Sequence, residues 1–137
     1  MPRILAIDYG AKRTGLAVSD PLGIIASPLD VIPSHTLEDF LKNYFENEDV
    51  SKVVIGMPIN TDGSPTNATS LDQAFINRFK KVFPTRELNL LDERFTSKMA
   101  LDAMIAGGMK KKQRQVKGNV DKVSATIILQ SYLSSIT

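Results

Sequence analysis

The sequence predicts an α/β fold in which helices cover a mixed sheet. Apolar runs suited to buried strands occur at 4–7, 16–18 and 50–55, and only a short polar turn separates the first two. Further along, strand-like runs alternate with segments in which apolar residues recur every three or four positions. Three strands in succession favour an antiparallel meander. The later alternation favours parallel strands with helices packed on the sheet.

Length and composition indicate one globular domain over residues 1–137, with 42% hydrophobic and 23% charged residues. The chain has no cysteine, which excludes disulfides, thiolate zinc sites and thiol nucleophiles. Its single histidine is His35, so a metal would need oxygen ligands, which favours magnesium or manganese. Neither a secretion signal nor a long apolar run is present. We expect a soluble, cytoplasmic protein with no membrane partner.

The first half of the chain has clear local signals. A third strand is expected within 22–31, and Pro28 places part of it at a sheet edge or a bulge. The sequence from Thr36 to Asp39 resembles a capping box, in which Thr36 would cap a helix. That helix is expected because apolar residues recur at helical spacing from Leu37 to Phe45.

The second half predicts four further elements after strand 50–55. A helix is expected around 71–82, ended by Pro84, and a short strand at 88–91. A third helix would run from Thr96 or Ser97 to Ile105, followed by the glycine pair 107–108. A final amphipathic helix is expected at 120–133. The predicted order is therefore β-β-β-α-β-α-β-α-α.

Three acidic residues stand where packing alone does not predict a charge. Asp8 directly follows the first strand, Glu93 follows the last, and Asp121 opens the final helix. If those strands are near neighbours, the carboxylates meet at one edge of the sheet. Carboxylates brought together raise one another's pKa, a penalty that divalent cations reverse. Two metals about 4 Å apart would then support phosphodiester hydrolysis without histidine or cysteine.

Each of these acidic residues also has an ordinary structural explanation. Asp8 could cap the turn that follows it. Asp92 and Glu93 could form a surface turn with a local ion pair. Asp121 could be a helix residue favoured by the macrodipole. Their joint occurrence is what favours a site over three unrelated local roles.

Positive charge accompanies these carboxylates, although the net charge is only +2. A basic segment covers 110–117, and cations also follow the first and last strands. Such residues can hold the phosphates of a nucleic acid, although a solvated charge run is an equally good explanation of the basic segment. The candidate phosphate-binding residues are Lys12, Arg13, Arg94, Lys98, Lys110, Lys111, Lys112, Arg114 and Lys117.

Four segments occur together in an order known from one family. They are Ile7–Gly15, Val54–Gly63, Leu91–Ser97 and Val120–Leu133. In this combination the chain resembles the YqgF family, also called RuvX, within the RNase H-like fold. The resemblance implies a central five-stranded mixed sheet flanked by helices, and a site at Asp8, Glu93 and Asp121. It also implies maturation of the 5′ end of 16S ribosomal RNA, or the earlier proposal of Holliday-junction resolution. Ser124 departs from the usual small apolar residue, which should affect helix packing more than chemistry.

The first hypothesis is a nuclease that acts on structured RNA, a ribosomal RNA precursor, with two Mg²⁺ or Mn²⁺ ions on Asp8, Glu93 and Asp121. Asp92 could assist. The second is an endonuclease for branched DNA with the same site, since phosphate contacts carry little sequence information. A non-catalytic RNA-binding assembly factor is a third. An actin-like ATPase is disfavoured, because those proteins use two such lobes. A monomer and a homodimer are both compatible with the sequence.

Overall fold

The computed structural model describes residues 3–57, 67–92 and 117–135. Within them a five-stranded sheet has the order β3-β2-β1-β4-β5. Its strands are β1 (Arg3–Asp8), β2 (Arg13–Ser19), β3 (Ala26–Pro33), β4 (Val50–Met57) and β5 (Glu87–Asp92). The first three pair antiparallel, and β4 and β5 continue the sheet in parallel with β1. The predicted meander followed by parallel strands is confirmed.

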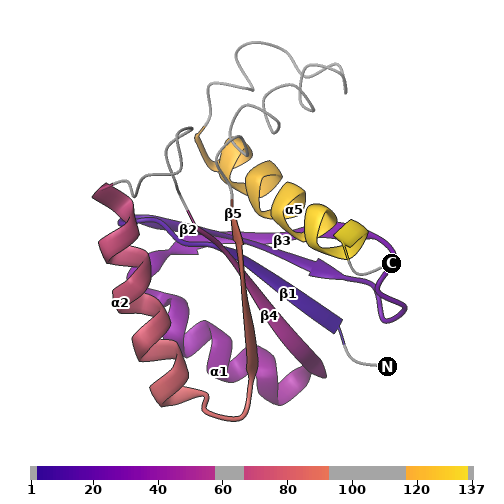
Figure 1. Ribbon diagram of the computed structural model, residues 1–137, viewed down its shortest axis with the longest axis horizontal. Coiled ribbons are helices and arrows are strands. Elements are labelled where there is room, and N and C mark those ends of the chain that lie inside the picture. Colours follow the sequence, from indigo (N-terminus) through magenta and orange to yellow (C-terminus); the bar gives the residue numbers. More distant parts are fainter. Residues whose placement is uncertain (1–2, 58–66, 93–116, 136–137) are drawn as a thin grey trace.

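Helices cover both faces of this sheet (Figure 1). A 3-10 turn, η1 (Ser34–Thr36), leads into α1 (Leu37–Asn47), which lies with α2 (Asn67–Val82) on one face. The last helix, α5 (Lys117–Ser135), lies on the other face. The helix expected between residue 96 and residue 105 falls outside the described residues.

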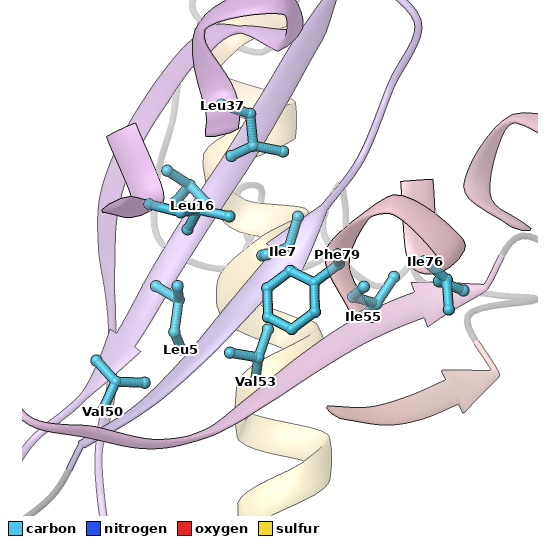
Figure 2. Packing of buried hydrophobic residues seen from close by; sticks show 10 residues of the cluster. Leu5, Ile7, Leu16, Leu37, Val50, Val53, Ile55, Ile76 and Phe79 are labelled. Atoms are coloured by element: carbon cyan, nitrogen blue, oxygen red, sulfur yellow. The ribbon is translucent and has the colours of Figure 1, made fainter. Parts of the chain in front are cut away.

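Side-chain alternation along the strands divides the core into two clusters. On the side of α1 and α2, Leu5 and Ile7 pack with Phe79, as Figure 2 shows. On the side of α5, Ile4 and Ala6 pack with α5. The α5 residues of this cluster are Ala125, Ile128, Leu129 and Leu133. The side chains of successive residues of β1 point to opposite faces of the sheet. The alternation therefore tells which face the side chain at the end of the strand belongs to.

The final helix is longer than the predicted 120–133, and its buried residues recur at helical spacing. Ser124 belongs to this buried face and is 4% exposed. It therefore occupies a packing position, which agrees with the expectation that this residue affects helix packing. Ile127 lies beside this buried face and is half-buried, so the apolar surface of α5 is wider than the row of fully buried residues. Across the three described stretches, no helix is long and apolar enough to cross a membrane.

The structure tests two local predictions with different outcomes. Pro28 does lie in an edge strand, and the pairing of β2 with β3 shifts register there, so that Leu16 opposes Asp30 and Ala17 opposes Pro28. The capping box at Thr36 is wrong. Thr36 has helical backbone angles and makes no side-chain cap bond, and its Oγ1 donates to the Pro33 carbonyl at 2.7 Å. The chain enters α1 from a 3-10 turn, not from the extended residue that capping requires.

Candidate active site at the carboxyl ends of the central strands

Three parallel strands end at one edge of the sheet. Ile7 pairs with Ile55, and Ile55 pairs with Leu90. The next row along the strands therefore contains Asp8 in β1, Gly56 in β4 and Leu91 in β5. Two strand spacings of about 4.8 Å put the backbones of Asp8 and Leu91 about 10 Å apart. The condition for the predicted site, that the first and last strands are near neighbours, is met, because only β4 lies between them.

Asp8 belongs to the face of the sheet that carries α5. It follows Ile4 and Ala6 in the alternation, and both pack in the α5-side cluster. Its side chain is half-buried at the strand end. In the neighbouring strand, Val54 packs in the same cluster, so Gly56 occupies the position beside Asp8 on this face. The neighbouring strand therefore contributes no side chain at the position next to the carboxylate.

The direction of α5 brings its first turns to the same edge. Gln130, near the other end of the helix, accepts a hydrogen bond from the Ala26 backbone at 3.4 Å. Ala26 pairs with Ser19, which lies at the opposite edge of the sheet from Asp8. The helix therefore runs from the Asp8 edge toward the far edge, as Figure 1 shows. The backbone of Asp121, five residues into α5 from Lys117, lies at the beginning of that path.

The structure thus brings together part of the predicted site. Asp8 and the helical turn of Asp121 share one edge and one face, whereas the side chains of Asp121, Asp92 and Lys117 are not described. Glu93 lies outside the described residues. So do Arg94, Lys98, Lys110, Lys111, Lys112 and Arg114. No cluster of three or more potential metal ligands occurs in the part of the chain that the structure describes. The donor that is described, the Asp8 carboxylate beside Gly56, is of the oxygen type that Mg²⁺ and Mn²⁺ prefer.

Lys12 is exposed on the turn that follows β1, and Arg13, the next residue, is exposed at the start of β2. This turn is anchored by Ser34, whose backbone N–H donates to the Lys12 carbonyl at 2.9 Å and whose Oγ donates to the Gly10 carbonyl at 2.5 Å. The Ser34 hydroxyl also bonds to the buried Thr14 hydroxyl at 2.8 Å. A β-carbon at Gly10 would lie 2.5 Å from the Arg13 carbonyl oxygen. The turn that presents both cations beside Asp8 therefore requires glycine.

Comparison with known proteins identifies the family. A family model described as "RuvX: Holliday junction resolvase" matches residues 2–135. The chain belongs to the RuvX family. A Flavobacterium johnsoniae relative is 55% identical over 135 residues, covering 98% of each chain, and its name describes a candidate pre-16S rRNA nuclease. A Phocaeicola vulgatus relative with the same name is 49% identical, covering 98% of this chain and 97% of its own. Membership of the RuvX family identifies this chain as an enzyme that hydrolyses phosphodiester bonds.

Solved structures confirm the fold of this RuvX-family chain. The fowlpox virus resolvase in complex with Holliday-junction DNA has a TM-score of 0.60 at 13% identity, covering 98% of both chains. The Thermus thermophilus RuvC complex with a Holliday-junction substrate has a TM-score of 0.56 at 14% identity, covering 99% of this chain and 96% of its own. The prediction of an RNase H-like fold, with a five-stranded mixed sheet flanked by helices, is confirmed.

A buried carboxylate that the sequence interpretation missed lies beneath α2. Asp72 is 1% exposed, one turn before Ile76 and two turns before Phe79 on the sheet-facing side of the helix. Neither of its carboxylate oxygens has a hydrogen-bond partner in the structure as described. Burial raises the pKa of Asp72 from 3.8 to about 6. Its spacing from Ile76 and Phe79 was a usable signal, because an acidic residue interrupts an otherwise apolar helical stripe.

The anchored turn generates the first prediction. Gly10→Ala should lower the free energy of unfolding by roughly 1–3 kcal/mol, because the added methyl group meets backbone that cannot move without breaking the Ser34 bonds. Urea denaturation measures this loss. The control is Ala11→Ser, an exposed change in the same turn, which should stay within about 0.5 kcal/mol of the wild type. Equal stability of Gly10→Ala and the control would contradict the requirement for glycine.

Asp72 generates a prediction about pH. Because its pKa is higher in the folded state than the ordinary 3.8, its favourable contribution is complete below about pH 4 and is lost as the pH rises through 6. Asp72→Asn removes this pH-dependent loss. The free energy of unfolding of Asp72→Asn, relative to that of the wild type, should therefore be higher at pH 8 than at pH 4. The difference should be at most about 3 kcal/mol, at about 1.4 kcal/mol per pKa unit.

Urea denaturation across this pH range measures the effect of Asp72→Asn. Asp49→Asn, at an exposed position before β4, is the matched control. It should reproduce the pH dependence of the wild type. If Asp72→Asn also reproduced that dependence, the carboxylate would not be desolvated in the folded protein.

Proposed function

We propose that this enzyme is a metal-dependent nuclease that acts in the cytoplasm on the 5′ end of the precursor of 16S ribosomal RNA. The observation that carries the proposal is the placement of Asp8 on the same edge and face of the sheet as the first turns of α5, the helix of Asp121. The names of the full-length relatives support the choice of RNA substrate.

Asp8, Glu93 and Asp121 would hold two divalent cations, Mg²⁺ or Mn²⁺, through carboxylate oxygens. When bound, such ions supply an activated water and charge stabilisation for the leaving oxygen. The chain's own contribution is positioning. Strand pairing holds Asp8 at the end of β1, and Gly56 keeps the adjacent position of β4 free of a side chain. Asp92, the last residue of β5, is available to assist.

Counter-charge for the substrate would come from Lys12 and Arg13, which the Ser34 anchor holds beside Asp8. Phosphate neutralisation of this kind gives affinity without sequence preference. The later cations named from the sequence, from Arg94 to Lys117, would extend this binding surface.

A second candidate function is cleavage of branched DNA at the same carboxylates. The family's description as Holliday junction resolvases favours it. Because phosphate contacts do not distinguish RNA from DNA, both substrates would approach the same edge of the sheet. Relative cleavage rates on the two substrates decide between these functions.

The proposal predicts that Asp8→Asn reduces cleavage more than about 100-fold, because an amide is a weaker and uncharged metal ligand. The measurement is cleavage of an end-labelled 16S precursor RNA with Mg²⁺ or Mn²⁺, with thermal unfolding as the check on folding. Asp39→Asn, an exposed change on α1, is the matched control and should cleave like the wild type.

The outcomes separate the alternatives. Specific RNA cleavage by wild type and Asp39→Asn alone supports the proposal. Faster cleavage of a four-way DNA junction supports the second candidate. Tight RNA binding without cleavage of either substrate indicates an assembly factor. Persistent cleavage by Asp8→Asn would contradict the assigned site.

A further inference from the structure

A cavity of about 280 Å³ lies between α1 and α2 on the face of the sheet opposite α5. Its apolar wall includes Leu41 and Phe79, both buried in the core. Its lining also includes the exposed residues His35, Ala74 and Arg78, so it opens to solvent. The cavity is therefore accessible to a ligand from outside the protein.

This cavity reaches the edge of the sheet that carries Asp8. Tyr9, the residue after Asp8, lines it and belongs to the opposite face in the strand alternation. Ser34 lines it too, and its bonds to the Gly10 and Lys12 carbonyls join the cavity wall to the turn that carries the cations. The candidate active site and the cavity thus lie on the two sides of one strand end.

The lining combines a cluster of aromatic side chains, Tyr9, Phe75, Phe79 and Phe83, with a charged rim. Tyr9 and Phe75 are stacked, with ring centroids 4.5 Å apart and planes 9° from parallel. At the rim, Arg78 donates to Glu38 through Nε at 2.7 Å and Nη2 at 3.3 Å. The Arg78 guanidinium holds the pKa of Glu38 below its usual value. The rim therefore presents both an ionised acceptor and a guanidinium donor.

From this geometry we infer that the cavity binds one unpaired nucleobase of a strand whose backbone passes Lys12 and Arg13 on its way to Asp8. Aromatic side chains stack on bases without regard to sequence, and polar groups at the edge of a pocket bond to the edges of an extruded base. The inference deepens the proposed function, on which its choice of nucleic acid rests.

An apolar side chain of a protein partner is the competing occupant. It would contact the aromatic lining but would offer no hydrogen-bonding group to Glu38 or Arg78 at the rim. The neighbouring cations Lys12 and Arg13 also favour a polyanion over a neutral peptide. Both considerations favour the base.

The test is an abasic scan, in which a short single-stranded RNA loses one base at a time and its affinity is measured by fluorescence anisotropy in EDTA. For the wild type, removal of one particular base should weaken binding about tenfold, which corresponds to one stacked base. Ala74→Trp fills the cavity from an exposed position of α2 and should abolish this difference. Gln73→Trp adds the same side chain at an exposed neighbouring position outside the lining and should preserve it.

A second variant guards against an indirect effect of tryptophan. Phe75→Leu keeps apolar volume but removes the ring that stacks on Tyr9, and it should also reduce the penalty for removing the base. Thermal unfolding of each variant verifies that it is folded.

Two results would overturn the inference and leave a protein side chain as the occupant. One is that no single base removal weakens binding to the wild type, and the other is that Ala74→Trp shows the same loss of affinity as the wild type. Because binding is measured without divalent ions, this result is independent of cleavage. A positive scan without metal-dependent cleavage would instead refute the proposed function and keep the base-binding site.

Discussion

The parallel pairing of β1 with β4 is the constraint on which the rest of the structure depends. Its register, with Ile7 beside Ile55, brings the end of β1 level with Gly56 and, one strand further, with Leu91. The apolar side chains on both faces hold this register, because a slip by one residue would exchange the two faces of β1. The position of Asp8 is thus determined by the packing of the four apolar residues before it.

The same alternation gives the strand end two different sides. Asp8 lies on the side of α5, and Tyr9, one residue later, packs against Phe75 on the side of α2. The anchored turn from Gly10 to Lys12 lies between these two surfaces, and Lys12 and the adjoining Arg13 give it positive charge. The strand end therefore has the Asp8 carboxylate on one side, positive charge at the turn, and the rings of Tyr9 and Phe75 on the other side.

Two aspartates show how much position matters to a buried carboxylate. Asp8 is only half-buried because the strand ends there, and its neighbour in β4 has no side chain. Asp72 lies within the apolar stripe of α2, is almost inaccessible and has no bonding partner in the described structure, so burial raises its pKa. A charge at the boundary of the core is available for chemistry, whereas a charge inside it mainly costs stability.

Apolar periodicity and a charge at a strand end are local properties, so the amino-acid sequence was enough to predict the five strands, the three described α-helices and the candidate Asp8. It also determined the family, through motifs that extend over the whole chain. Only the three-dimensional structure shows that Thr36 continues a 3-10 turn, which Ser34 anchors to the turn after β1. The same is true of the stacking of Tyr9 on Phe75 and of the hydrogen bond from Arg78 to Glu38. These features depend on contacts between residues distant in the chain, and local patterns carry no record of such contacts.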